Sequence, residues 1–285
     1  MNRKKEEQSY LVVKANELVQ QARFDLDVQE QKIVLFLVSK IKPTDSEFKW
    51  YDLRVVDFRE TLNIKSYAGG SYYDYIKSLI KKLADKSAWL KLDPNSDEET
   101  LVRWIDKARI NKKKDILKVR LDEDLKPFLL QLKKHFTAYE LWYVLSMKSQ
   151  YSIRLYEFLK SLLHKKETYT KTFKLEYLKE KMSAEKQVKY YDFKRFGLEK
   201  AISEINQFTD LEVAYEAIFE KNRCKEIVLS VKVKDVLERA KIADSFFNGC
   251  QLDIFEQLPT DSNDWEVIYE KSDSRQGART ISDGV

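Results

Sequence analysis

The chain has 285 residues, 43% of them apolar and 35% charged, with only six glycines, four prolines and two cysteines. This composition is typical of a folded protein with long helices and short turns, and the length suffices for two domains. Two cysteines are too few for a disulfide framework or a zinc site of the usual four ligands, so we expect a reducing compartment. No stretch of about 18 apolar residues occurs, and we therefore expect neither a signal peptide nor a membrane-spanning helix.

Charge is divided unevenly along the chain. Residues 244–285 hold nine acidic residues against three basic ones, a net charge of −6, and because the whole chain carries +5, residues 1–243 carry +11. A basic body favours a polyanionic partner such as nucleic acid, although many basic proteins bind none. The body of the chain is where we expect such a surface.

The first half alternates helical and strand-like patterns. After a β-prone run at 11–13 and a helix that starts at Asn16, Asp27 is placed to cap an apolar helix that Pro43 closes. The elements that follow are a strand at 48–53, a short helix at 56–63, a longer helix at 71–90, a hairpin of strands at 101–110 and 116–121 with a basic turn at 111–115, a short helix or linker at 125–134, and a long helical region at 136–163.

A helix over residues 189–206 and a hairpin over 211–233 follow in the second half. On a wheel of 3.6 residues per turn, the core stripe of this helix is Tyr191, Lys194, Leu198, Ile202 and Ile205. The outward face is Asp192, Phe193, Phe196, Lys200 and Ser203. A helix followed by a hairpin, with shorter helices before it, is the order of a winged helix, which lays one helix in the DNA major groove. An ordinary amphipathic helix with a solvated polar side would show the same stripe.

The two halves repeat one pattern at an offset of 118 to 120 residues. The run Tyr72-Tyr73-Asp74-Tyr75 corresponds to Tyr190-Tyr191-Asp192-Phe193. Because both halves run helix, short strand, short helix, longer helix and hairpin, the sequence predicts an α+β fold of two tandem winged-helix domains related by pseudo-duplication. We place the domains at 1–126 and 127–241. An acidic tail at 242–285 follows, either disordered or folded as a short element around 246–255.

Four stretches of the second half resemble a known family. They read SQYSIRLYEFL at 149–159, FKR at 193–195, LEKAISEIN at 198–206 and TDL at 209–211. These stretches resemble the replication initiators of iteron-containing plasmids, and the likeness in layout covers residues 10–235. The resemblance implies two winged-helix domains. The C-terminal one docks on repeated double-stranded origin sites, the iterons, and the N-terminal one contributes accessory DNA contacts and the dimer interface.

The same resemblance implies a cytoplasmic, bacterial protein on plasmid DNA that takes part in copy-number control. Members of the family recruit host replication machinery, with a host helicase or initiator proteins as partners, initiate as monomers, and repress their own promoter as dimers on an operator inverted repeat. The recognition element would be 190–200 and the helix leading into it 154–163. This sequence departs from the family at Gly197, where an apolar residue is usual. Glycine inside a helix costs on the order of 1 kcal/mol against alanine, which predicts a close backbone approach or a bend there.

The candidate DNA-binding residues are cations and their neighbours on outward faces and hairpin turns. In the first domain they are Lys65, Ser66, Tyr73, Lys77, Lys81, Lys112, Lys113 and Lys114. In the second domain they are Lys189, Tyr190, Lys194, Arg195, Lys200, Arg223 and Lys225. Side chains in the first turns of a recognition helix reach base edges, and lysines on outer faces position the protein on phosphates. Charge runs at turns are usually only solvated, and Phe193 and Phe196 either meet thymine methyl groups or pack against the wing or the other domain.

The sequence supplies no recognisable catalytic or metal site. His135 and His164 are the only histidines and lie 29 residues apart, so the closely spaced histidine pair of a plasmid nickase is missing, and no P-loop motif occurs. We expect no enzyme activity, no catalytic residue, no cofactor and no metal. Two alternatives stay open: a winged-helix transcriptional repressor without a role in initiation, and an assembly protein that binds no DNA and uses its two aromatic and basic faces for protein contacts.

Overall fold

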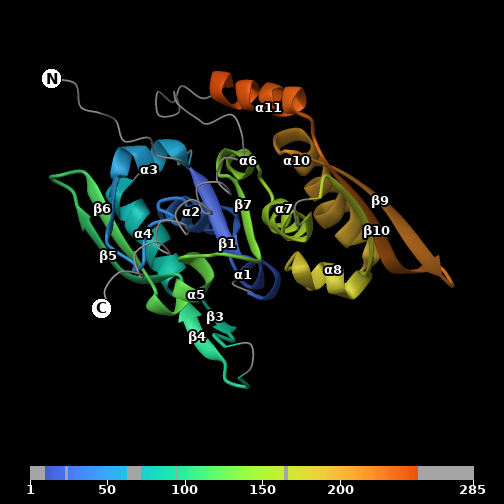
Figure 1. The fold of residues 1–285 in the computed structure, drawn as a ribbon, viewed down its shortest axis with the longest axis horizontal. Helices are drawn as coiled ribbons and strands as arrows, with labels where there is room; N and C mark the ends of the chain where they lie inside the picture. Colours follow the sequence, from blue (N-terminus) through green and yellow to red (C-terminus); the bar gives the residue numbers. More distant parts are fainter. Residues whose placement is uncertain (1–9, 23–24, 63–71, 94–95, 164–165, 250–285) are drawn as a thin grey trace, which may run out of the picture.

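The structure is a computed structural model that describes residues 10–22, 25–62, 72–93, 96–163 and 166–249 (Figure 1). The elements of its first unit are β1 (Leu11–Ala15), α1 (Asn16–Gln21), α2 (Val28–Val38), β2 (Tyr51–Arg54), α3 (Val55–Thr61), α4 (Tyr72–Ala84), β3 (Ser87–Leu90), β4 (Thr100–Arg103), β5 (Ile105–Asn111), β6 (Ile116–Leu121), the short 3₁₀ helix η1 (Glu123–Leu125) and α5 (Lys126–Leu129). The elements of its second unit are β7 (Phe136–Glu140), α6 (Trp142–Leu145), α7 (Gln150–Leu163), β8 (Thr168–Lys174), α8 (Leu175–Lys181), α9 (Tyr190–Asp192), η2 (Phe193–Leu198), α10 (Glu199–Phe208), β9 (Leu211–Glu220), β10 (Arg223–Val233) and α11 (Val236–Gly249).

The two units share one topology. The strand order is β2-β6-β5 in the first sheet and β8-β10-β9 in the second, with every pair antiparallel. In each unit a long helix precedes the sheet (α2 or α7), a short helix follows its first strand (α3 or α8), and a longer helical segment leads to the closing hairpin. Two winged-helix domains of α+β class are therefore confirmed. The β3–β4 hairpin is an addition to the first unit.

Strands β1 and β7 join the two units along a short antiparallel ladder. Leu11 pairs with Glu140 at one end of this ladder and Ala15 with Phe136 at the other. The predicted helical region over 136–163 is therefore wrong at its start, because residues 136–140 form a strand and α7 begins only at Gln150. Their pairing partner lies more than a hundred residues away in sequence, where a local helical pattern cannot detect it.

The predicted helix over 71–90 and the predicted strand over 101–110 are also too long. Helix α4 ends at Ala84, and the residues after it form β3, which pairs with β4 so that Trp89 lies opposite Leu101. Ala88 and Leu90 are buried while Trp89 is exposed, the alternation of a strand and not of a helix. Trp104 interrupts the second predicted strand and separates β4 from β5.

Helix α11 continues past residue 241, where we placed the start of the acidic tail. It lies against α6, with the rings of Phe246 and Phe247 at 5.7 and 5.8 Å from the ring of Trp142 (Figure 1). The rest of the acidic tail, from residue 250, lies outside the described residues. Among the helices that the structure describes, none combines the length and the apolar character needed to cross a membrane.

Candidate nucleic-acid interface

A π turn interrupts the helix that we expected to recognise DNA. Residues Phe193–Leu198 form η2, between the short helix α9 and the longer α10. Gly197 lies in this turn, and a Cβ atom there would stand 3.2 Å from Cδ2 of Phe193, closer than side chains usually pack. The glycine therefore leaves room for the Phe193 ring in a distorted turn, and this close neighbour belongs to the same helix and not to another element.

The π turn changes which residues face the core. Phe193 is fully buried and Tyr191 is 72% exposed, so both sequence-based placements are wrong and the two residues exchange roles. The helical wheel assumed 3.6 residues per turn throughout, whereas a π turn contains one extra residue and rotates everything before it. The stripe after the turn is as predicted, because Leu198, Ile202 and Ile205 are buried.

The predicted cations of this helix lie on its outer side. Lys189, Arg195 and Lys200 are exposed, and Lys194 is half-buried, with its Nζ 3.5 Å from Oε1 of Glu199. The guanidinium of Arg195 lies 5.1 Å from the ring centroid of Phe196, a neighbouring exposed ring. This surface offers cations and apolar rings together.

Tyr190 joins the helix to the second wing, the β9–β10 hairpin. Its ring meets Phe219 of β9 edge-on at 5.5 Å, and its hydroxyl lies near the buried thiol of Cys224 on β10. A β-bulge between Cys224 and Glu226 follows directly. The predicted contacts Arg223 and Lys225 are exposed and flank Cys224 in β10, close to the turn of the wing.

In the first unit, Tyr73 makes the corresponding connection between α4 and the β5–β6 turn. Its hydroxyl donates to Oδ1 of Asp115 at 2.9 Å, and this hydrogen bond raises the pKa of Tyr73. Asp74 of α4 lies 3.4 Å from Nζ of Lys112 and 3.7 Å from Nζ of Lys77. The remaining predicted cations, Lys81, Lys113 and Lys114, are exposed. Lys65 and Ser66 lie outside the described residues.

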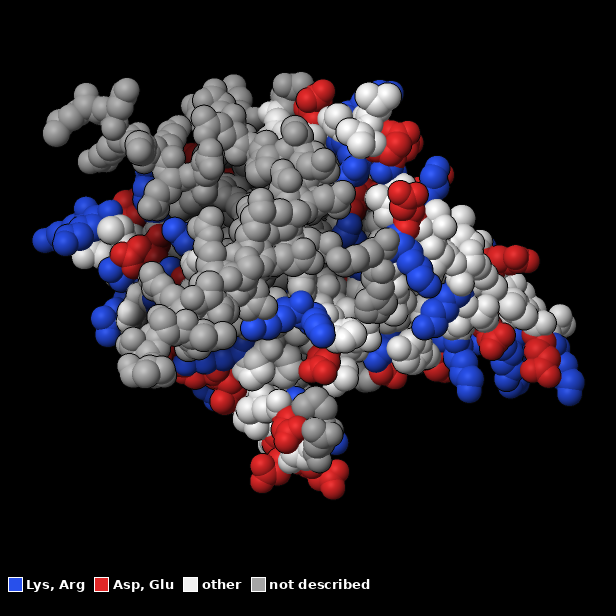
Figure 2. Space-filling model, viewed as in Figure 1, with Lys and Arg blue, Asp and Glu red and all other residues white. Residues whose placement is uncertain are grey.

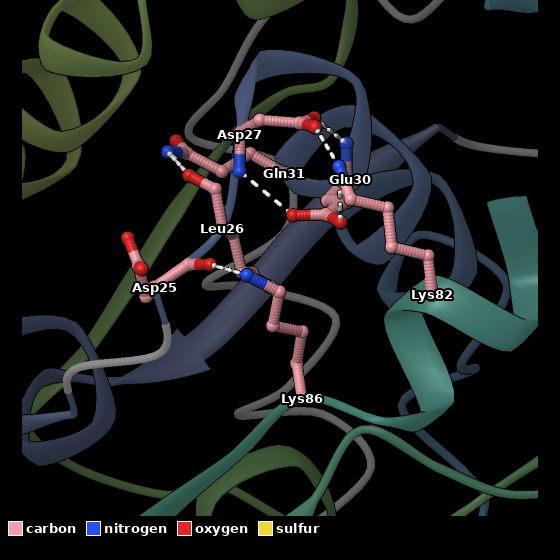
Figure 3. A network of polar contacts seen from close by, with 7 residues as sticks. All are labelled: Asp25, Leu26, Asp27, Glu30, Gln31, Lys82 and Lys86. Atoms are coloured by element: carbon pink, nitrogen blue, oxygen red, sulfur yellow. Dashed lines mark hydrogen bonds and ion pairs between the residues drawn. The ribbon is translucent and has the colours of Figure 1, made fainter.

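A polar network holds α4 against the start of α2 (Figure 3). Asp27 and Glu30 form a capping box at the first turn of α2. Lys82 of α4 donates to Oδ2 of Asp27 at 2.6 Å and lies 3.1 Å from Oε1 of Glu30, and its contacts with these two carboxylates raise the pKa of Lys82 to about 12. Just after α4, Lys86 donates to the backbone carbonyl of Asp25 at 2.5 Å. The helix that carries Lys77 and Lys81 is thereby fixed in place.

The junction between the units is polar and buried, and sequence patterns did not reveal it. Lys14 of β1 forms an ion pair with Glu157 of α7, and both side chains are almost fully buried. The hydroxyl of Tyr139 also donates to Glu157. Beside this pair, Asn16 accepts a hydrogen bond from Thr137 at 2.6 Å. The contacts of Lys14 with Glu157 and of Asn16 with Thr137 link residues more than 100 positions apart, beyond the reach of any local signal.

The two basic turns lie at opposite ends of the long axis of the molecule. The β5–β6 turn extends at one end and the β9–β10 turn at the other (Figure 1). Figure 2 shows lysine and arginine side chains gathered at both ends, with acidic side chains among them. Each turn stands next to the helix whose predicted cations are described above. The arrangement provides two basic surfaces, one at each end of the molecule.

Comparison with known proteins identifies the family. The model described as "Initiator Replication protein, WH1" matches residues 11–160, and "Initiator Rep protein, WH2" matches residues 174–231. The chain belongs to the initiator Rep protein family. The resemblance inferred from the sequence is confirmed. The WH1 match extends through β7, α6 and most of α7, which are grouped above with the second unit, and the WH2 match runs from the end of β8 into β10.

Individual proteins that match this initiator Rep protein have low sequence identity to it. A replication initiation protein of Escherichia coli is 26% identical over 211 residues, which cover 72% of this chain. The match spans about two thirds, 65%, of the length of that protein. A crystal structure of domains 2 and 3 of RctB is 14% identical and aligns with a TM-score of 0.42, over 73% of this chain and 82% of that one.

Proposed function

We propose that this initiator Rep protein binds repeated double-stranded DNA sites at a plasmid origin and recruits the host replication machinery there. The observation that supports the proposal best is the duplicated arrangement of an exposed basic helix beside a hairpin with a basic turn. A winged helix uses these two parts to enter the major groove and to hold the backbone. Two of them on one chain can engage two stretches of one duplex.

The division of work between the units follows from their surfaces. The first unit offers lysines such as Lys77, Lys81 and Lys113, which suit contacts to phosphate and carry no sequence information. The second unit adds Arg195, which suits hydrogen bonding to base edges. The second unit therefore selects the repeat, and the first adds affinity.

Several further properties belong to the same proposal. The protein acts without catalysis, cofactor or metal, in the bacterial cytoplasm, and takes part in copy-number control. It initiates as a monomer and represses its own promoter as a dimer on an inverted repeat, with the first unit as the dimer interface. Unwinding of the origin comes from host partners, such as a helicase or an initiator protein.

Footprinting on the DNA that flanks the gene tests the proposal. Tandem protected repeats are the expected result, whereas a lone inverted repeat would favour a transcriptional repressor with the same fold. Binding to the protected DNA, measured by gel shift, should weaken steeply as salt is raised. A plot of log K against log salt concentration should have a slope of about −0.9 for each phosphate neutralised. No shift with any DNA at low salt would overturn the proposal and favour an assembly protein.

A further inference from the structure

Two aromatic side chains are exposed on the outer side of the predicted recognition helix. Tyr191 is 72% exposed and Phe196 is 52% exposed, although rings of this size usually pack against other apolar groups. Cations stand around them, with Arg195 against the ring of Phe196 and Lys200 exposed one turn further on. Among the described residues of α4, the corresponding helix, no large apolar side chain is exposed.

The π turn aligns these two rings. Residues five apart in an α-helix point about 140° away from one another, but a π turn brings them to the same side. Phe193 and Leu198 are five apart across the turn, and both are fully buried. Tyr191 and Phe196 have the same spacing, and both are exposed. The turn at Gly197 therefore places one aromatic pair in the core and a second pair outside.

The outer pair is held in position before any ligand binds. The ring of Tyr190 meets Tyr191 edge-on at 5.4 Å and Phe219 of the wing at 5.5 Å. Phe196 projects from the π turn and lies against the Arg195 guanidinium. Because these rings lose little freedom on binding, they suit contacts that select a ligand.

We propose that Tyr191 and Phe196 contact the C5-methyl groups of thymines in the major groove of the bound repeat. The surrounding cations attract a polyanion, and the thymine methyl is the apolar group that the major groove of B-DNA displays. Each repeat should then carry thymines at fixed positions facing this helix. The inference rests on the proposed function and adds to it the base that this surface selects.

Replacing thymine by deoxyuridine tests the inference, because it removes the methyl group and leaves base pairing intact. Gel shifts compare the footprinted repeat with duplexes that carry deoxyuridine at one thymine position each. Wild-type protein should lose about three- to fivefold in affinity for each contacted methyl, the value that corresponds to burial of one such group. Phe196→Ala and Tyr191→Ala should each lose the sensitivity at one position and keep it elsewhere.

Ile218→Ala is the matched control. Ile218 is 41% exposed on β9, and it points to the strand face opposite Phe219, away from Tyr190. This variant should keep the wild-type response to every deoxyuridine. All three truncated side chains are exposed, so the variants should keep the wild-type Tm, which thermal unfolding checks.

The outcomes separate this inference from the proposed function. Equal affinity of the wild-type protein for the thymine and deoxyuridine duplexes would overturn the inference and leave repeat binding in place. Unchanged sensitivity in both Phe196→Ala and Tyr191→Ala would do the same. Absence of any shift at low salt would overturn the proposed function, and the inference with it.

Discussion

Lys82 on α4 and Glu204 on α10 make the same kind of connection in the two units with opposite charge. Lys82 approaches the capping carboxylates at the start of α2. Glu204 instead accepts hydrogen bonds from the backbone N–H groups of Lys148 and Ser149, at 3.1 and 3.2 Å, just before α7. Each predicted DNA-facing helix is thereby tied to the helix that precedes its sheet.

Replacing Lys82 should destabilise the first unit more than replacing its neighbour. Lys82→Ala removes the cation beside Glu30, whose side chain is only 1% exposed. The half-exposed lysine limits the effect, and we expect a loss of about 1 kcal/mol in the free energy of unfolding. Urea unfolding measures it. Lys81→Ala, at an exposed neighbouring position, should change stability little. Equal effects of the two substitutions would contradict a special role for Lys82.

Gly197→Ala should destabilise the protein even though alanine favours helices. The added Cβ would stand 3.2 Å from the ring of Phe193, which is fully buried and has little room to move. We expect a net loss of about 1 kcal/mol, after the gain in helix propensity is counted. The shift of the urea midpoint at constant m-value measures it. A more stable variant would show that the π turn does not require glycine.

Local signals in the sequence predicted the parts of the fold that local chemistry determines. Asp27 caps α2 as expected, because the capping box lies within four consecutive residues. The order of helices and strands, which local patterns reveal one element at a time, predicted the duplicated winged helix. Tyr191 and Phe193 were exchanged, because a wheel with a fixed period cannot show where a π turn begins.

Long-range contacts were beyond prediction. Residues 136–140 form a strand because they pair with β1, which is distant in sequence. The ion pair of Lys14 with Glu157 joins a strand of the first unit to a helix of the second. The described members of the predicted DNA surface lie on exposed or half-buried positions of the two helices and turns. Their contacts with DNA stay predictions, because no local rule says which exposed cation meets a phosphate.

Removing Glu157 alone should cost more than removing it together with its partner. Burial lowers the pKa of Lys14, an effect that the charge of Glu157 opposes. Glu157→Ala leaves Lys14 buried without its counter-ion, and we expect a loss of 3 to 5 kcal/mol, roughly, in the free energy of unfolding. The double variant Lys14→Met, Glu157→Leu should lose much less, because no buried charge is left. If the loss in the double variant, measured by urea unfolding, equalled the sum of the losses from changing each residue alone, this coupling would be contradicted.

The stability of the protein should fall between about pH 4.5 and pH 7 because of Glu140. Burial is the main cause that raises the pKa of Glu140 from 4.5 to about 7. The charge of Asp210 adds to this shift, and the charge of Lys160 opposes it. Between these two pKa values the folded state binds a proton that the unfolded state has released, so rising pH destabilises the fold. Over this range we expect the free energy of unfolding to fall by about 3 kcal/mol less in Glu140→Gln than in wild type. Urea unfolding at several pH values measures the difference, and parallel curves would exclude Glu140 as its source.

Arg195 and Lys113 should differ in the kind of DNA affinity that they provide. Arg195 stands in the second turn of the predicted recognition helix, from which we expect side chains to reach base edges, and its guanidinium lies against the Phe196 ring. Arg195→Ala should weaken binding to the repeat by about 1 to 3 kcal/mol and leave binding to scrambled DNA nearly unchanged.

Lys113 is exposed at the β5–β6 turn, at the other end of the molecule, and suits a phosphate. Lys113→Ala should weaken both DNAs alike and reduce the salt slope by about 1, because one fewer counterion is released. Gel shifts with both DNAs at two salt concentrations separate the cases. If Arg195→Ala instead lowered both affinities equally, the arginine would be a backbone contact, and the choice of repeat would have to come from other residues of the same helix.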